Sequence, residues 1–245
     1  MPIVFVHGVP ETSHLWKDVR AALGRSDTVA VALPGFGSAR PAGFGATKEE
    51  YVDWLIGEIE RVGKPVDLVG HDWGGGFTLR VASLRPDLLR SWVSDAAGLG
   101  DVRFEWHEFA KIWQTPEAGE AFFQQQLSLP VEERAKLFEG FGVPAAKARE
   151  MAGWIDQTMA DSILALYRSA IDVGREWAPA IGKIRTPGLV IIPEQDPFLK
   201  AELAEGTAQG SGAEAVRLEG VGHWWPLQSP GRGAQVLSSF WASLA

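Results

Sequence analysis

Short apolar runs rich in β-branched residues alternate with longer stretches of helical periodicity along most of the chain. Such runs are typical of buried strands, and helices between them indicate a parallel sheet with right-handed crossovers. The pattern therefore predicts an α/β fold. We expect its strands at Ile3–Val6, Thr28–Leu33, Val66–Val69, Ser91–Ser94, Gly188–Ile192 and Ala215–Leu218.

Helical periodicity fills the intervals between these runs. Thr47 followed by Glu50 predicts a capping box, in which each side chain bonds the other's backbone N–H at the start of a helix. We expect the helices of the core at residues 14–23, 48–62, 74–84, 199–208 and 231–244.

Residues 101–182 depart from this alternation, because helical patterns occur there without a convincing strand. The helices are separated by Thr115-Pro116, Leu129-Pro130 and Val143-Pro144. An insertion at this point would lie over the carboxyl edge of the sheet, where open α/β sheets place their ligands. We therefore predict a core of residues 1–100 and 183–245, with a helical cap at 101–182 inserted after the fourth strand.

Composition and charge narrow the classes of function. The chain has 245 residues, of which 46% are hydrophobic, and this suits one α/β domain with an insertion. Its formal net charge is −8 and no basic run occurs, so we expect no nucleic-acid partner. The chain has no cysteine, and its five histidines form no HExxH pair, so we expect no metal site.

The sequence also bears on location and assembly. No apolar stretch approaches the ~20 residues of a membrane span, so we expect no membrane partner. No basic and apolar leader precedes the first predicted strand, which favours a cytoplasmic protein. Eleven tryptophans against two tyrosines indicate either a tryptophan-rich core or an aromatic-lined apolar pocket. The oligomeric state is left open, a homodimer included.

Gly70-His71-Asp72-Trp73-Gly74 fits the G-x-nucleophile-x-G turn between a strand and a helix, with aspartate where hydrolases commonly have serine. Glycines at both ends allow strand and helix to approach, so that the central residue can adopt a strained backbone and project its side chain. A phosphate-binding turn is the alternative, but neither glycine cluster of the chain completes a GxGxxG pattern. We interpret Asp72 as a nucleophile.

A nucleophile requires a base, and the base requires an orienting acid. His223 lies in the glycine-flanked segment GVGHWWPL, and Asp196 follows a predicted strand in the segment EQDP. The chain order Asp72, Asp196, His223 is that of the α/β hydrolases. Asp95, directly after the strand at 91–94, is a rival for the acid, and we favour Asp196 because its strand-to-turn context is more regular.

The first predicted strand is followed by His7-Gly8-Val9-Pro10. The backbone N–H of Val9, together with that of Trp73, would form an oxyanion hole. Pro10 has no N–H and cannot be the second donor.

These segments together resemble the α/β-hydrolase superfamily: HG-x-P near the start, LPGFGSA at 33–39, GHDWGG, EQDP and GHWW. By motif the chain is most similar to epoxide hydrolases and to haloacid and haloalkane dehalogenases, whose nucleophile is aspartate. The resemblance implies Asp72 as nucleophile, His223 as base and Asp196 as acid, without a cofactor. The family commonly has two antiparallel strands before HG-x-P, which this chain lacks, so Thr28–Leu33 is expected at an exposed edge.

The resemblance also implies what an aspartate does there. A carboxylate displaces at a saturated carbon, opening an epoxide or expelling halide, and so forms an alkyl ester on Asp72. His223 then activates a water that attacks the carboxyl carbon of that ester. The oxyanion hole at Val9 and Trp73 would serve this second step.

Epoxide opening needs proton donors for the developing alkoxide. Tyr167, in ILALYRSAID, resembles the cap tyrosine of epoxide hydrolases, and His107, the single histidine of the cap, would complete a His/Tyr pair. Tyr51 lies in a predicted core helix and is a poor candidate. We therefore predict a hydrolase for a small apolar epoxide, with Asp72, His223, Asp196, Tyr167 and His107 as its catalytic residues.

A dehalogenase is the alternative, with halide held by the indole of Trp73 and that of a cap tryptophan, Trp106, Trp113 or Trp154. Against this, haloalkane dehalogenases typically have asparagine after HG, where this chain has Val9. Fluoroacetate-type enzymes have arginines where this chain has Trp73 and Gly76. A third alternative is an idle hydrolase fold that only binds a ligand; the intact Asp-Asp-His set argues against it.

Overall fold

The six apolar runs form one parallel sheet in the computed structural model, which describes residues 1–244. The strands lie in the order β2-β1-β3-β4-β5-β6, and every neighbouring pair is parallel. The predicted α/β fold with a parallel sheet is confirmed, and so is the place of β2 at an edge. The six strands are β1 (Ile3–Val6), β2 (Thr28–Val31), β3 (Val66–Gly70), β4 (Leu89–Ser94), β5 (Gly188–Gln195) and β6 (Glu214–Gly222).

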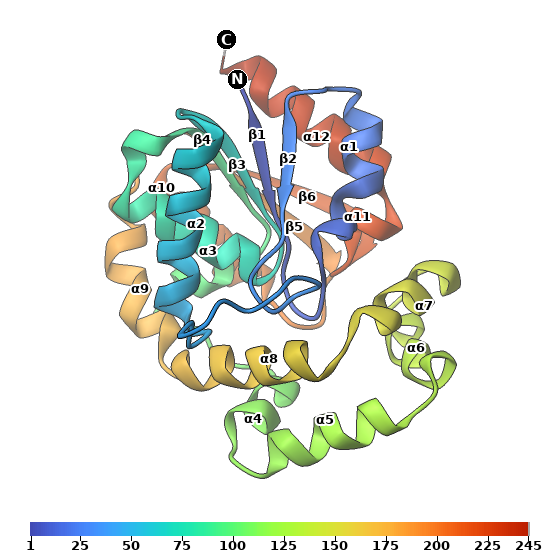
Figure 1. Cartoon of the computed structure of the whole chain (residues 1–245). Coiled ribbons are helices and arrows are strands. Elements are labelled where there is room, and N and C mark those ends of the chain that lie inside the picture. Colours follow the sequence, from blue (N-terminus) through green and yellow to red (C-terminus); the bar gives the residue numbers. More distant parts are fainter. Residues whose placement is uncertain (245) are drawn as a thin grey trace.

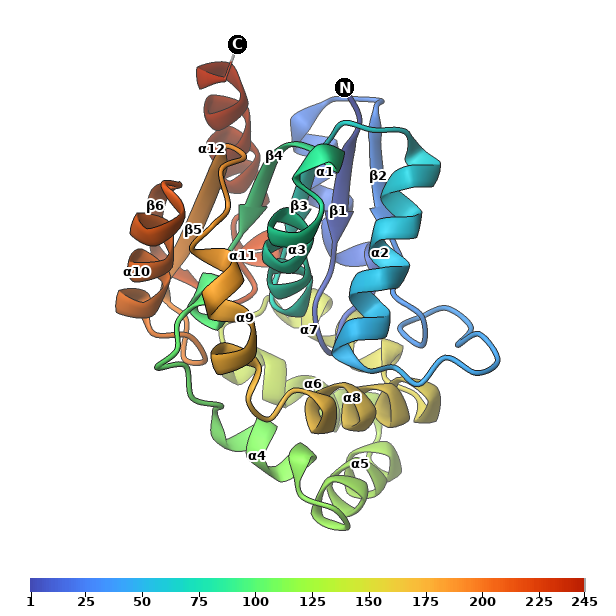
Figure 2. The same ribbon diagram turned by 90° about the vertical axis from the view of Figure 1, so that its left-hand side faces the viewer.

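Helices cover both faces of this sheet (Figures 1 and 2). Alternate strand residues point to opposite faces, so Val4 and Val6 pack into one apolar cluster while Ile3 and Phe5 pack into another. One face carries α2 (Lys48–Val62), α3 (Trp73–Leu84) and α10 (Ala201–Ser211). The other carries α1 (Lys17–Leu23), α11 (Trp225–Gln228) and α12 (Pro230–Ser243).

The predicted bounds differ from the observed ones in every strand except β1. The strand β2 ends at Val31 instead of Leu33, β3 ends at Gly70 instead of Val69, and β4 begins at Leu89 instead of Ser91. Both β5 and β6 continue past the predicted Ile192 and Leu218, because they remain paired beyond Pro193, where the register shifts. The first predicted helix begins as a 3-10 turn, Ser13–Trp16, before α1. The capping box of Thr47 and Glu50 is present at the start of α2. Short 3-10 turns also occur at Pro86–Leu88 and Ala97–Gly100.

The chain between β4 and β5 is helical, as predicted. In Figure 1 the N-terminus lies at one end of β1, whereas α4, α5 and α8 cross the opposite, carboxyl end of the sheet. The inserted helix α9 lies beside α3, against the core (Figure 2). The bounds are α4 (Glu108–Gln114), α5 (Ala118–Ser128), α6 (Val131–Gly140), α7 (Ala145–Trp154), α8 (Gln157–Ser169) and α9 (Val173–Ile181).

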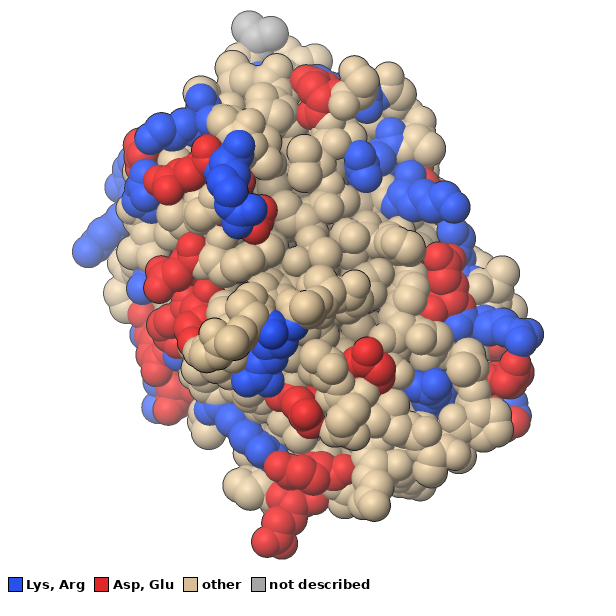
Figure 3. All heavy atoms as spheres, viewed as in Figure 1, with Lys and Arg blue, Asp and Glu red and all other residues tan. Residues whose placement is uncertain are grey.

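The surface carries mixed charge. Figure 3 shows the face of the molecule that is seen in Figure 1. Acidic and basic side chains are interspersed over it, with broad uncharged areas between them. Across residues 1–244, every helix is too short or too polar to span a bilayer.

Candidate active site

Asp72 occupies a sharp turn between β3 and α3. Its backbone angles, a φ of 50° and a ψ of −124°, lie in a region that residues other than glycine rarely adopt. The neighbouring glycines make the turn possible: a Cβ on Gly70 would overlap the Gly74 carbonyl, and a Cβ on Gly74 would overlap that of Val6. A Cβ on Gly8 would strike Asp72 itself. The local sequence thus projects one carboxylate over the carboxyl edge of the sheet.

The two carboxylate oxygens of Asp72 have different surroundings. Oδ1 accepts a hydrogen bond of 2.8 Å from the backbone N–H of Val9. Oδ2 lies 3.7 Å from Nε2 of His223. Burial raises the pKa of Asp72 to about 6, and the His223 charge opposes this rise. One oxygen is therefore held by a backbone donor, while the other lies beside the imidazole.

His223 follows the end of β6 and is held by Asp196, which follows β5. Nδ1 of His223 lies 2.8 Å from Oδ2 of Asp196, whose Oδ1 accepts from the N–H groups of Phe198 and Leu199. Burial lowers the pKa of His223, but the charge and hydrogen bond of Asp196 outweigh it and leave that pKa above its usual value. The structure therefore brings the side chains of Asp72, His223 and Asp196 together.

Asp95, the rival acid, faces His71 instead of His223. Its Oδ2 lies 2.5 Å from Nδ1 of His71 and accepts from the indole N–H of Trp225 at 2.6 Å. Its Oδ1 accepts from the backbone N–H of Asp72 at 2.8 Å. Asp95 therefore supports the backbone of the nucleophile turn.

His71 lies between two buried carboxylates. Opposite Asp95, its Nε2 lies 3.1 Å from Oε1 of Glu11, which also accepts from the indole of Trp224 at 2.6 Å. The other oxygen of Glu11 accepts from the N–H of Gly8 at 2.8 Å. We call Glu11, His71 and Asp95 the buried clamp.

Charge holds the buried clamp together. Burial lowers the pKa of His71, but the carboxylates of Asp95 and Glu11 outweigh it and raise the pKa well above its usual value. Both ring nitrogens face carboxylate oxygens, so both donate and the ring is an imidazolium. Each carboxylate also accepts from further N–H donors. The clamp joins the loop that carries the Val9 donor to the turn that carries Asp72.

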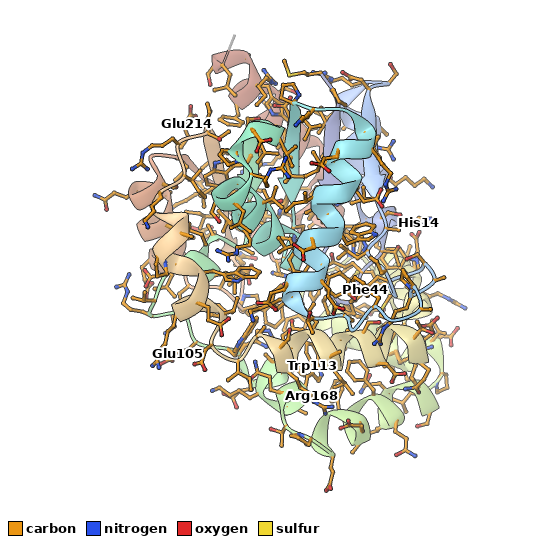
Figure 4. The ribbon with its side chains drawn as sticks, turned by 60° about the vertical axis from the view of Figure 1, so that its left-hand side comes forward. His14, Phe44, Glu105, Trp113, Arg168 and Glu214 are labelled. Carbon is orange, nitrogen blue, oxygen red and sulfur yellow. The ribbon has the colours of Figure 1, made fainter. Side chains whose placement is uncertain are left out.

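A cavity extends from Asp72 and His223 into the cap. Tyr167 of α8 and His107, the N-cap of α4, both line it, and their ring centroids are 6.5 Å apart. Figure 4 labels Trp113 in the cap, where its ring lies 4.8 Å from that of Tyr167. Most of the remaining wall is aromatic, including Phe109, Phe122, Phe123, Phe138, Phe141 and Phe198.

His107 and Tyr167 both carry a proton at neutral pH. Burial, helped by the nearby His223, lowers the pKa of His107 to about 4, so the ring is neutral. Its Nδ1 accepts from the N–H of Ala110 at 3.2 Å, which leaves the proton on Nε2. Burial and the Asp72 charge raise the pKa of Tyr167 well above its usual value, so its hydroxyl stays protonated.

A family model described as "Alpha/beta hydrolase family" matches residues 3–236. The chain belongs to the α/β hydrolase family. Haloalkane dehalogenase 2 of Mycobacterium tuberculosis is 31% identical over 172 residues, covering 69% of this chain and 54% of that protein. Epoxide hydrolase 2 of Siraitia grosvenorii is 33% identical over 97 residues, covering 38% of this chain and 31% of that protein. This α/β hydrolase thus spans about half the length of the mycobacterial relative and under a third of the plant one.

Solved structures agree on the fold. An epoxide hydrolase from Bacillus megaterium superimposes with a TM-score of 0.80 at 22% identity, over 98% of this chain and 93% of that one. A haloalkane dehalogenase from Bradyrhizobium elkani gives a TM-score of 0.73 at 18% identity, over 99% of this chain and 91% of that one. The α/β-hydrolase fold with six parallel strands and a helical insertion after β4 is therefore confirmed.

The tryptophans of this α/β hydrolase differ in how their indole N–H groups are used. Trp106 donates to the carbonyl of Ala170 at 2.8 Å, so its donor is occupied. Trp154 lies outside the cavity wall, in a different surface hollow. Within the described part of the chain, the buried N–H groups of Trp73 and Trp113 have no acceptor. Trp113 lines the cavity, where a ligand could meet its N–H group, whereas Trp73 lies outside the cavity wall.

Glu11, His71 and His223 place one potential metal-ligand atom each within 4.8 Å of one another. Metal binding requires deprotonated imidazole nitrogens. Both nitrogens of His71 instead face carboxylates, and Nδ1 of His223 is bonded to Asp196. The donor set fits a hydrogen-bonded network better than a metal site.

Sequence reasoning missed the buried clamp. Two signals were available: Glu11 directly follows the HG-x-P segment, and His71 directly precedes Asp72. The two tryptophans that bond Glu11 and Asp95 directly follow His223 in the sequence. No local pattern indicates that these distant residues meet.

Proposed function

We propose that this α/β hydrolase opens a small apolar epoxide to a vicinal diol through an alkyl ester on Asp72. The observation that carries the proposal is the shared cavity: Tyr167 and His107, both protonated, line the same space as Asp72 and His223. Ring opening creates an alkoxide, and donors opposite the nucleophile are what that step needs.

In the first step, Oδ2 of Asp72 attacks one ring carbon, and the bond from that carbon to the epoxide oxygen breaks. Oδ1 stays bonded to the Val9 N–H, so Oδ2 is the oxygen left to react. The epoxide oxygen takes the proton of the Tyr167 hydroxyl and accepts a hydrogen bond from Nε2 of His107. The product of this step is the hydroxyalkyl ester of Asp72.

In the second step, His223 takes a proton from a water, and the hydroxide attacks the carboxyl carbon of the ester. Negative charge develops on the oxygen that accepts from Val9, and the backbone N–H of Trp73 completes the oxyanion hole. Collapse expels the alkoxide, which takes the proton back from His223 and leaves as diol. The proton left on the Asp72 carboxyl group returns to the Tyr167 oxygen, which regenerates both groups. Asp196 orients the imidazole and stabilises its charged form.

Haloalkane dehalogenation is the second candidate. It is favoured by the indole N–H group of Trp113, which lines the cavity and in residues 1–244 has no acceptor, so that it could hold a halide. The mycobacterial haloalkane dehalogenase also aligns over more of this chain than the plant epoxide hydrolase does.

The test is turnover of aryl and alkyl epoxides beside bromoalkanes of matched carbon skeleton. We expect diol from the epoxides at a rate well above bromide release from their partners. Bromide release without diol formation would replace the proposal by the dehalogenase. Saturable binding of both series without any product would replace it by an idle fold that binds ligands.

A further inference from the structure

The cap end of the cavity carries one arginine in a wall that is otherwise mostly apolar. Arg134 of α6 lines it, together with the amide side chain of Gln126 from α5. No other lysine or arginine contributes to the cavity wall. Arg134 is half-buried, so its guanidinium lies at the cap end of a mostly aromatic wall, with the Nε atom itself buried.

Arg134 has unused donors. Its Nη1 donates to the carbonyl of Ile155 at 2.9 Å. Its Nε is buried, and within residues 1–244 it has no acceptor; nor does any carboxylate there form an ion pair with Arg134. By contrast, Arg149 pairs with Glu132, and Arg168, labelled in Figure 4, pairs with Glu120 through two hydrogen bonds.

The geometry of a guanidinium defines what would fit. With Nη1 committed to Ile155, the free edge is the one that carries the Nε and Nη2 protons. Two parallel N–H groups on one edge match the two oxygens of a carboxylate. A buried donor without an acceptor is unfavourable, and a ligand that supplies the acceptor removes this cost.

We propose that Arg134, with Gln126, forms a carboxylate subsite, and that the preferred substrates are apolar epoxides with a carboxylate at the far end. The statement rests on the proposed function, since it concerns the substrate of that same site. The ring lies at Asp72, the apolar body lies against the aromatic wall, and the carboxylate lies on Arg134. The net charge of −8 gives no general attraction for anions, so the preference comes from this residue.

Binding to the inactive Asp72→Asn variant tests the subsite without turnover. The probes are phenylbutyrate and its primary amide, measured by calorimetry. We expect the carboxylate to bind about ten- to a hundredfold more tightly, as a charged hydrogen-bonded pair does. Adding Arg134→Met should abolish the difference and leave amide binding unchanged. Arg149→Met, at an exposed arginine of the same cap, should change neither.

Equal affinity for the two probes would overturn the subsite. Equal weakening of carboxylate and amide binding in Arg134→Met would also overturn it, because Arg134 would then only hold the Ile155 carbonyl. The variant Arg134→Lys retains the positive charge and should keep part of the preference for the carboxylate.

The kinetic arm compares an epoxy fatty acid with its methyl ester in the enzyme with Asp72 intact. A kcat/KM preference for the acid that Arg134→Met removes supports the subsite. Probe binding that depends on Arg134, without diol from either epoxide, would leave the subsite standing and reject the epoxide hydrolase. Diol formation without discrimination between acid and ester would support the epoxide hydrolase and reject the carboxylate subsite.

Discussion

Asp95→Asn tests whether the buried clamp holds the site together. Three N–H groups converge on the Asp95 carboxylate, from His71, Trp225 and the backbone of Asp72. Asparagine has a single acceptor oxygen, so in either orientation its NH₂ group faces at least one of these donors. The variant also leaves the His71 imidazolium with one counter-charge.

The expected loss is large, because removing one partner of a buried ion pair typically costs about 3–5 kcal/mol. In a protein of this size each kcal/mol lowers Tm by roughly 2–4 °C, so we expect a fall of about 6–20 °C. The folded-state pKa of His71 is raised, so the ion pair contributes its full stabilisation below the usual histidine pKa of about 6.5 and loses it progressively as pH rises through the folded-state value. The difference in Tm between Asp95→Asn and the wild type should therefore become smaller in strongly alkaline solution.

The assay is thermal unfolding followed by circular dichroism at neutral and alkaline pH. Asp53→Asn, at an exposed position of α2, is the matched control and should leave Tm nearly unchanged. If Asp95→Asn also shifts Tm by less than about 1 °C, the clamp contributes nothing measurable.

Three further results are expected. His223→Gln should form the ester without hydrolysing it, giving a stable adduct in the intact-protein mass spectrum, and Asp196→Asn should slow the same step; normal turnover in both would point to another base. Tyr167→Phe should slow epoxide opening about a hundredfold, and His107→Gln should act similarly; unchanged single-turnover adduct formation would remove the pair from ring opening. Asp72→Asn should raise Tm near pH 7 but not near pH 4, because a pKa raised by burial from 3.8 to about 6 makes ionisation unfavourable in the folded state; a lower Tm at pH 7 would contradict this.

The alternation of apolar runs and helices predicted all six strands and their parallel arrangement. Burial on both faces makes central strands such as β1 continuously apolar and easy to recognise. The edge strand β6 is exposed over most of its length, and its apolar pattern stops at Leu218 because the exposed pair Glu219-Gly220 follows. The limits of the cap remain a prediction, since α9 packs against α3 of the core.

Motifs predicted the contact between His223 and Asp196 because each motif has a fixed place at the carboxyl edge of a strand. Their catalytic roles remain predictions. The clamp was not predictable, because its contacts join residues far apart in the chain: Trp224 and Glu11 are separated by 213 positions. Arg134 was missed for a related reason, since one arginine in a helix gives no sign of facing a cavity.

The most direct test of the account is a single turnover of an epoxide in water enriched in ¹⁸O, with enzyme in excess. If Asp72 forms an ester that is hydrolysed at its carboxyl carbon, the first diol carries oxygen from the enzyme. The heavy isotope then appears in the peptide that contains Asp72, as a mass increase that Asp72→Asn abolishes. Heavy oxygen in the first diol, with an unlabelled peptide, would mean direct attack by water and would contradict the covalent mechanism.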